Sequence, residues 1–155
     1  MNVREVMVKA PHFCDAQMNC AAAIEHLWTA GCGALPVVDA GKKVIGIVTD
    51  RDICIALGTR NRRASDVAIG DVMTAEVVTC HADDDIHDAL DAMRARKVRR
   101  LPVVDGEGKL EGMLTASDVL VHARHNDGSR PELSYENIVN ALRGICLHCP
   151  QAARR

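Results

Sequence analysis

The spacing of hydrophobic and polar positions predicts one short series of elements, which is clearest in the second half of the chain. Val77 to Thr79 predict a short strand, and Ile86, Leu90 and Met93 then recur at helical spacing, directly after three aspartates that suit a helix N-terminus. The apolar run LPVV predicts a buried strand, and the turn DGEGK followed by KLEGMLT predicts a hairpin. ASDVLVHA predicts a second helix, so the order is β-α-β-β-α.

The first half of the chain repeats this order. Residues 6–58 align with residues 72–124 without a gap, and both copies contain LPVVD followed by a strand that ends in Gly-x-x-Thr-x-x-Asp. Gly46 and Gly112 hold the same position in the two copies, 66 residues apart. Two copies, rather than many, predict a pseudo-two-fold pair of β-α-β-β-α units in the α/β class with a mixed (α+β) sheet, and not a solenoid.

The repeat also predicts how the chain is divided. The predicted parts are repeat 1 at 1–58, a linker at 59–70, repeat 2 at 71–126 and a C-terminal extension at 127–155. The linker is polar and basic, so we expect it at the surface.

The extension has no counterpart in the repeat. Ser134 is expected to cap a helix in it, because Ile138, Leu142 and Ile145 align on one face. We expect this helix to pack on the module or on a partner chain.

Composition narrows the function classes. The net charge of −2 gives no global attraction to nucleic acid, and the single Trp, Tyr and Phe give no platform on which bases could stack. No apolar run approaches the roughly 20 residues that cross a bilayer, and the N-terminus lacks a signal-peptide core, so we expect a soluble cytoplasmic protein. The seven cysteines are expected to be free thiols, with Cys20, Cys54 and Cys80 acting as small buried hydrophobes.

The repeated Thr-x-x-Asp motif has two interpretations. Thr49 and Thr115 precede helices, and an acid three residues later completes the capping-box pattern, which needs no ligand. Alternatively, a strand that runs into a helix N-terminus suits phosphate, and Asp52 and Asp118 are acceptors suited to a ribose diol. Threonine and aspartate together then match a nucleotide.

The two copies place their arginines differently. Repeat 2 carries a basic run up to Arg100 just before LPVV, where repeat 1 is neutral, whereas repeat 1 has Arg51 in its motif where repeat 2 has Ser117. Arginine suits phosphate oxygens by geometry. We expect Arg51 and Arg100 to contact phosphate, and the other cations of the run, Arg94, Arg96 and Lys97, to be solvated.

Two copies of Val-Met, LPVVD and Gly-x-x-Thr-x-x-Asp in constant register resemble a tandem pair of CBS domains, the Bateman module, of the stand-alone bacterial signal-transduction type. The resemblance implies clefts between the repeats that bind AMP, ADP, ATP, NAD, S-adenosylmethionine or cyclic di-AMP, and a homodimer. It implies that Asp52 and Asp118 hold ribose and that Thr49 and Thr115 meet phosphate. The other ligand-binding residues that it implies are Ala34, Pro36, Arg51, Met73, Val78, Thr79, Arg99, Arg100, Pro102 and Ser117.

Other chemistry has weaker support. Cys146, His148 and Cys149 form a CxxC with an inserted histidine, but no second CxxC completes a four-ligand zinc site, so we expect no metal. No motif with a catalytic mechanism accompanies the histidines, so we expect no enzyme, and we expect solvated side chains at His81, His87, His122 and His125.

Two hypotheses from different classes remain. The first, which we favour, is an adenine-nucleotide sensor that signals by conformational change to an unidentified partner protein. The second is an oligomeric scaffold in which Asp52 and Asp118 are only helix caps.

Overall fold

The structure is a computed structural model that describes residues 1–123 and 133–147. The chain forms two compact units. The repeat-1 unit contains residues 10–77 and 104–111, and the repeat-2 unit contains residues 1–9, 78–103 and the chain from 112 onward. Among the helices that the structure describes, none has both the length and the apolar character needed to span a bilayer.

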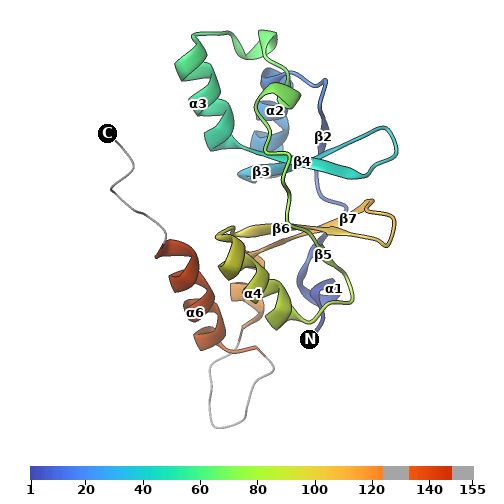
Figure 1. The fold of residues 1–155 in the computed structure, drawn as a ribbon, viewed down its shortest axis with the longest axis vertical. Helices are drawn as coiled ribbons and strands as arrows, with labels where there is room; N and C mark the ends of the chain where they lie inside the picture. Colours follow the sequence, from blue (N-terminus) through green and yellow to red (C-terminus); the bar gives the residue numbers. More distant parts are fainter. Residues whose placement is uncertain (124–132, 148–155) are drawn as a thin grey trace. The chain divides into compact units, whose positions relative to one another are not determined.

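The repeat-1 unit is built on a three-stranded sheet of order β2-β3-β4, in which β3 runs parallel to β2 and antiparallel to β4 (Figure 1). Every residue of β3 is buried, because helices and neighbouring strands enclose it. Its elements are β2 (Cys14–Asp15), α2 (Cys20–Ala30), β3 (Ala34–Val38), β4 (Val44–Thr49) and α3 (Asp50–Arg60), followed by the 3-10 turns η1 (Ala64–Asp66) and η2 (Ile69–Asp71).

The repeat-2 unit is built on a four-stranded sheet of order β1-β7-β6-β5. The unit's elements are α1 (Val3–Val6), β1 (Val8–Lys9), β5 (Cys80–His81), α4 (Ile86–Arg96), β6 (Arg100–Val104), β7 (Leu110–Thr115), α5 (Ala116–His122) and α6 (Tyr135–Cys146). Each repeat therefore follows the predicted β-α-β-β-α order, and the predicted fold class is confirmed.

The predicted C-terminal helix is present as α6. Ser134 caps it, since its side chain accepts a hydrogen bond from the Asn137 amide. Ile138 is fully buried, and Leu142 and Ile145 pack against the same core. The helix thus packs on its own module, over α4 and α5.

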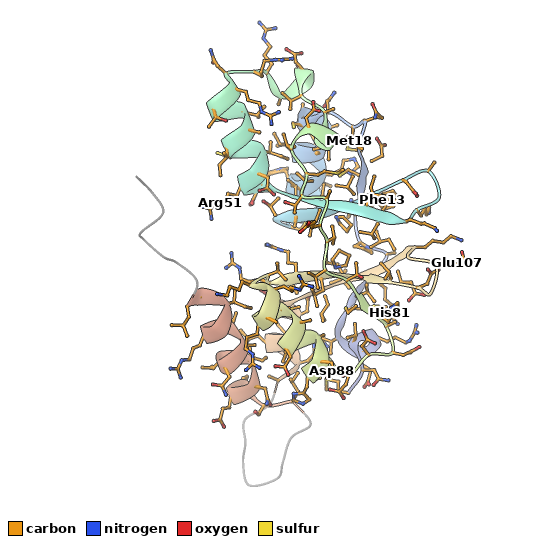
Figure 2. All side chains as sticks on the ribbon, viewed as in Figure 1. Phe13, Met18, Arg51, His81, Asp88 and Glu107 are labelled. Atoms are coloured by element: carbon orange, nitrogen blue, oxygen red, sulfur yellow. The ribbon has the colours of Figure 1, made fainter. Side chains whose placement is uncertain are left out.

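The turn of the β6–β7 hairpin belongs to the repeat-1 unit. Leu110 N–H donates to the Lys42 carbonyl at 3.0 Å, and Val44 N–H donates to the Gly108 carbonyl at 3.0 Å. Glu107, at the tip of this hairpin (Figure 2), forms an ion pair with Lys109 at 2.7 Å.

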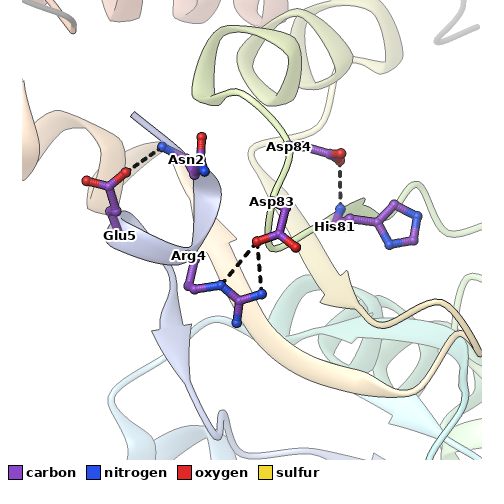
Figure 3. Close-up of polar contacts among 6 residues, drawn as sticks. All are labelled: Asn2, Arg4, Glu5, His81, Asp83 and Asp84. Atoms are coloured by element: carbon purple, nitrogen blue, oxygen red, sulfur yellow. Dashed lines mark hydrogen bonds and ion pairs between the residues drawn. The ribbon is translucent and has the colours of Figure 1, made fainter.

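Residues near the start of each repeat join the sheet of the other one. Val8 pairs with Met113 of β7, and Thr74 forms the equivalent bridge with Ile47 of β4. Arg4 of α1 forms an ion pair with Asp83 at 3.0 Å (Figure 3). The N-terminal residues are therefore a structural part of the repeat-2 unit, and the boundaries drawn from the sequence repeat stay a prediction.

Two local expectations differ from the structure. The short strand before α4 is Cys80–His81 and not Val77 to Thr79, although Val78 still packs against the core. In the segment after α3, Val67 and Ile69 are buried, because Ile69 N–H donates to the Met18 carbonyl and so holds the chain against the β2–α2 loop.

Candidate ligand-binding residues

Thr49 and Asp52 form a complete capping box where β4 runs into α3. The Asp52 Oδ2 atom accepts hydrogen bonds from the Thr49 N–H at 3.0 Å and from the Thr49 hydroxyl at 2.7 Å. The Thr49 hydroxyl oxygen in turn accepts a bond from the Asp52 N–H at 3.2 Å. Both bonds to the carboxylate end on Oδ2, so the other carboxylate oxygen, Oδ1, takes no part in the cap.

Thr115 and Asp118 repeat this geometry at the start of α5. The Asp118 Oδ2 atom accepts from the Thr115 N–H at 2.9 Å and from its hydroxyl at 2.6 Å, and the Asp118 N–H donates to the Thr115 hydroxyl at 3.2 Å. Both pairs are half-buried. The capping interpretation of the motif is therefore confirmed, and any contact with a ligand is a second role for the same side chains.

The first strand of each hairpin lies beside the motif. In the repeat-1 unit, Ala34 pairs with Thr49, and the Asp50 N–H donates to the Gly33 carbonyl at 3.4 Å. In the repeat-2 unit, the Ala116 N–H donates to the Arg99 carbonyl at 3.0 Å. Predicted site residues that are distant in sequence thus lie together at the start of α3 in repeat 1 and of α5 in repeat 2.

The charge beside the motif differs between the units. In the repeat-2 unit, Arg99 is exposed and Arg100 half-buried, and neutral Ala116 and Ser117 open the helix. In the repeat-1 unit, the corresponding strand start is neutral.

Sequence reasoning missed one residue of this site, Asp50. Its carboxylate accepts the Arg51 N–H at 2.7 Å, so it occupies one of the free donors of the α3 N-terminus. The exposed Arg51 side chain extends away from α3 (Figure 2). The signal that identifies Asp50 is its alignment with Ala116, which makes the first motif acidic and the second neutral at that position.

The remaining predicted residues differ in their burial. Pro36 and Pro102 are buried in the middle of β3 and β6, Val78 is half-buried, and Thr79 is exposed. Met73 belongs to the repeat-1 unit, where its side chain contacts Gly46.

The cysteines separate into two groups. Cys14, Cys20 and Cys80 are buried, and burial raises the pKa of Cys14 and of Cys80 from 9.0 to about 12. The prediction that Cys54 is buried was wrong, since it is exposed on α3, whereas Ile53 and Ala56 of the same helix are buried. Cys146 is exposed, whereas His148 and Cys149 lie outside the described residues.

The histidines differ in exposure. His81 and His122 are exposed and His87 is half-buried, whereas His125 lies outside the described residues. Within residues 1–123 and 133–147, no three His, Cys, Asp or Glu side chains form a group that could hold a metal ion.

Comparison with protein families matches the CBS domain model twice, over residues 3–59 and 69–125. A protein of Bacillus subtilis (strain 168), YlbB, is 30% identical over 85% of this chain and 88% of its own length. The inosine-5'-monophosphate dehydrogenase of Nitrosopumilus maritimus is 29% identical over 81% of this chain. The chain spans only a quarter of that enzyme and less than half of a Methanopyrus kandleri relative.

Solved structures show the same fold. The CBS domain pair of protein MJ0100 in complex with 5'-methylthioadenosine and S-adenosyl-L-methionine has a TM-score of 0.71 and 26% identity, covering 78% of this chain and 94% of that one. CBSX2 in complex with AMP has a TM-score of 0.67 and 28% identity, covering 77% and 93%. The CBS domain protein TA0289 of Thermoplasma acidophilum has a TM-score of 0.77 and 21% identity, covering 98% and 83%.

Proposed function

Because the chain belongs to the CBS-domain family, we propose that it is a regulatory module that binds an adenosine-containing ligand and signals to a separate partner by a conformational change. CBS pairs that resemble it at 26% and 28% identity bind S-adenosylmethionine with methylthioadenosine, and AMP. The observation that carries the proposal is the duplicated motif in which Asp52 and Asp118 use only one carboxylate oxygen for the cap.

A carboxylate with one oxygen outside the cap suits a ribose. In each motif, Oδ2 is committed to the threonine, and Oδ1 keeps lone pairs that accept the hydroxyl hydrogens of a ribose diol. The threonine hydroxyl already donates its one hydrogen to the aspartate, so it binds a phosphate only if that hydrogen is redirected. We therefore assign the ribose to the aspartates and give the arginines the larger part in phosphate binding.

We place the phosphate at the repeat-2 residues. Arg99 and Arg100 offer planar guanidinium groups there, and Ala116 and Ser117 add no negative charge. At the repeat-1 residues, the Asp50 carboxylate opposes an anion that Arg51 alone would attract. A phosphorylated adenosine then prefers Asp118, whereas an adenosine without phosphate is accepted beside Asp52.

The other predicted residues surround the base and ribose in this proposal. Val78, Thr79 and Pro102 flank the ligand in the repeat-2 unit, and Ala34, Pro36 and Met73 flank it in the repeat-1 unit. These contacts come from the likeness to the family, and the buried positions of Pro36 and Pro102 suit apolar walls.

Signalling requires a second state. A ligand shifts a conformational equilibrium only by its difference in affinity for the two states. The two states of the module must therefore differ in the position of the arginines relative to the ligand. We propose that the module acts as a homodimer on an unidentified partner protein. The dehydrogenase activity of the Nitrosopumilus relative is not carried over, since this chain spans a quarter of that enzyme.

A scaffold without a ligand is the second candidate function. A third capping box, between Ser134 and Asn137, has the same hydrogen bonds as the two motifs, although it lies outside the repeats. The capping box by itself is therefore no evidence of a ligand. This observation favours a purely structural role for Asp52 and Asp118 if no adenosine compound binds.

Thermal unfolding with AMP, ADP, ATP, NAD, NADH, S-adenosylmethionine and cyclic di-AMP tests the two functions. A ligand at a hundred times its dissociation constant adds about 2.7 kcal/mol. In a protein of this size that raises the midpoint by on the order of 5–10 °C. A shift with at least one of these compounds supports the sensor, and no shift with any of them leaves the scaffold.

A further inference from the structure

Two histidines of the repeat-1 unit lie with their rings edge to face. His12 comes two residues before the buried Cys14 of β2, and His26 lies in the middle of α2. Their ring centroids are 6.1 Å apart, and the two ring planes meet at 84°. His12 is exposed and His26 is half-buried, so the pair reaches the surface at His12.

The Nδ1 atom of His26 lacks a hydrogen-bond partner. Among the described residues, it is the one buried side-chain nitrogen or oxygen atom in this position. Buried polar atoms are nearly always paired, so a buried nitrogen without a partner calls for an explanation such as a bound water or ion. A neutral imidazole has a lone pair on one ring nitrogen, and this nitrogen is the commonest metal ligand in proteins. The surroundings of His26 therefore fit a metal ligand.

The distance between the two rings suits an ion that lies between them. A nitrogen–metal bond of about 2.0–2.1 Å places two ligating ring centroids roughly 5–6.5 Å apart, for angles at the ion from tetrahedral to linear. A direct hydrogen bond between the rings would instead bring the centroids to roughly 5 Å. The observed 6.1 Å is too long for the hydrogen bond and lies within the range for a shared ion.

The second repeat shows that packing does not require imidazoles at these two positions. The residues aligned with His12 and His26 are Val78 and Ala92. Both are half-buried and pack against the apolar core of the repeat-2 unit. Repeat 1 therefore carries two nitrogen ligands at positions where repeat 2 has only apolar side chains, and such a pair occurs once in the two repeats.

We propose that His12 and His26 together bind one divalent transition-metal ion per chain. Imidazole nitrogen suits Zn²⁺, Ni²⁺ and Cu²⁺, whereas Mg²⁺ and Ca²⁺ prefer oxygen ligands. Since residues 1–123 and 133–147 contain no group of three His, Cys, Asp or Glu side chains suited to a metal, water completes the coordination. The site is thus an open one, with two protein ligands.

The ion would join two segments that are anchored in one core. Cys14, just after His12, and Cys20 and Leu27, on the helix that carries His26, belong to the same buried cluster. Both ligands are thereby held in place before the ion arrives. The site uses none of the residues assigned to ribose or phosphate, so it does not rest on the proposed function.

Calorimetric titration of Ni²⁺ into the full chain, prepared without a histidine tag, tests the site. Ni²⁺ is the probe because thiolates compete for Zn²⁺. His12→Ala and His26→Gln should each weaken one binding step by at least about tenfold, since a residue that only orients a metal ligand already contributes that much. His81→Ala, at an exposed position of the repeat-2 unit, is the control and should titrate like the wild type.

The variants also separate metal binding from folding. His26→Gln keeps a polar side chain of similar size, and circular dichroism shows whether each variant folds. If His26→Gln does not fold, His12→Ala decides alone, because His12 is exposed. A wild type that binds no Ni²⁺, or a His12→Ala variant that titrates like the wild type, overturns the proposal.

The fluorescence of Trp28 locates the ion. Trp28 is the only tryptophan of the chain and lies two residues after His26 on α2. Bound Ni²⁺ quenches a nearby indole, whereas Zn²⁺, with its filled d shell, does not. Ni²⁺ should therefore quench the wild type to a saturating level, excess Zn²⁺ should reverse this, and His12→Ala should show only the linear quenching of collisions. Saturable quenching that persists in His12→Ala, or that is absent from the wild type, contradicts the site.

Discussion

Met73 occupies the space that a side chain on Gly46 would need. A Cβ at residue 46 would lie 2.6 Å from the Met73 sulfur and 3.2 Å from the Thr74 carbonyl oxygen. Gly112 has the same relation to Met7, with the Val8 carbonyl oxygen at 3.0 Å. Glycine begins each Gly-x-x-Thr-x-x-Asp motif because residues near the start of the other repeat cross the strand at this point.

Alanine at either glycine should therefore destabilise the fold. Gly46→Ala and Gly112→Ala force the methionine and a backbone carbonyl to move, and overpacking of this kind costs about 1–3 kcal/mol. Urea unfolding measures the change. Gly106→Ala is the control, because nothing lies within 4 Å of its Cβ position. Equal stability of all three variants would show that the methionines yield without cost.

The repeat made most of the fold predictable from the sequence, since both copies had to follow one order of elements. The contact of Met7 with Gly112 and that of Met73 with Gly46 were not predictable. Each is a long-range contact made by a short segment with weak periodicity. The exposure of Cys54 was missed for a similar reason. Its neighbours Ile53 and Ala56 turn the apolar face of α3 inward, and a single helical position decides which side a residue takes.

The capping pairs of the candidate site were predictable because Thr-x-x-Asp is a local pattern. The role of Asp50 was not, since its effect depends on which amide it accepts from once the helix is formed.

Packing of α6 on its own module makes a separate prediction. Ile138→Ala should lower the free energy of unfolding by about 2–5 kcal/mol, because Ile138 is fully buried. Val139→Ala, at a position 52% exposed on the same helix, should change it by less than about 0.5 kcal/mol. Denaturant unfolding compares the two. If they are equally mild, α6 does not contribute to the core.

The buried thiols predict a loss of stability in alkali. The pKa of Cys14 and of Cys80 rises from 9.0 to about 12 on folding, so between these values the folded state holds protons that the unfolded chain releases. Stability is then complete below pH 9 and falls as the pH rises, by up to about 1.4 kcal/mol per pH unit for each thiol.

Urea unfolding at about pH 8 and about pH 10 tests this slope. The wild type should lose up to about 2–3 kcal/mol more over this interval than a variant with both Cys14→Ala and Cys80→Ala. Comparison of the losses, rather than of the absolute stabilities, removes the effect of the cavities that the substitutions leave. Identical losses would mean that these thiols ionise as readily in the folded protein as in the unfolded chain.

The charge difference between the motifs predicts where a phosphate binds. Arg100→Ala should weaken AMP binding by about 10- to 100-fold, the value of a hydrogen bond to a charged group. Arg96→Ala removes the same charge from the exposed end of α4 and should have little effect. Asp50→Ala should strengthen binding of AMP at the repeat-1 residues. Calorimetric titration measures all three, and equal affinities for Arg100→Ala and Arg96→Ala would contradict the placement.

The most direct test of the ligand-binding account is a calorimetric titration of AMP into the wild type, Asp118→Ala and Asn137→Ala. Both substitutions remove a capping box, at a cost of about 0.5–2 kcal/mol of stability, but only Asp118 is assigned to the ribose. The account predicts that AMP binds the wild type and Asn137→Ala with the same affinity and that Asp118→Ala loses this binding. AMP binding that survives in Asp118→Ala would contradict it, as would a wild type that binds neither AMP nor any other adenosine compound of the thermal panel.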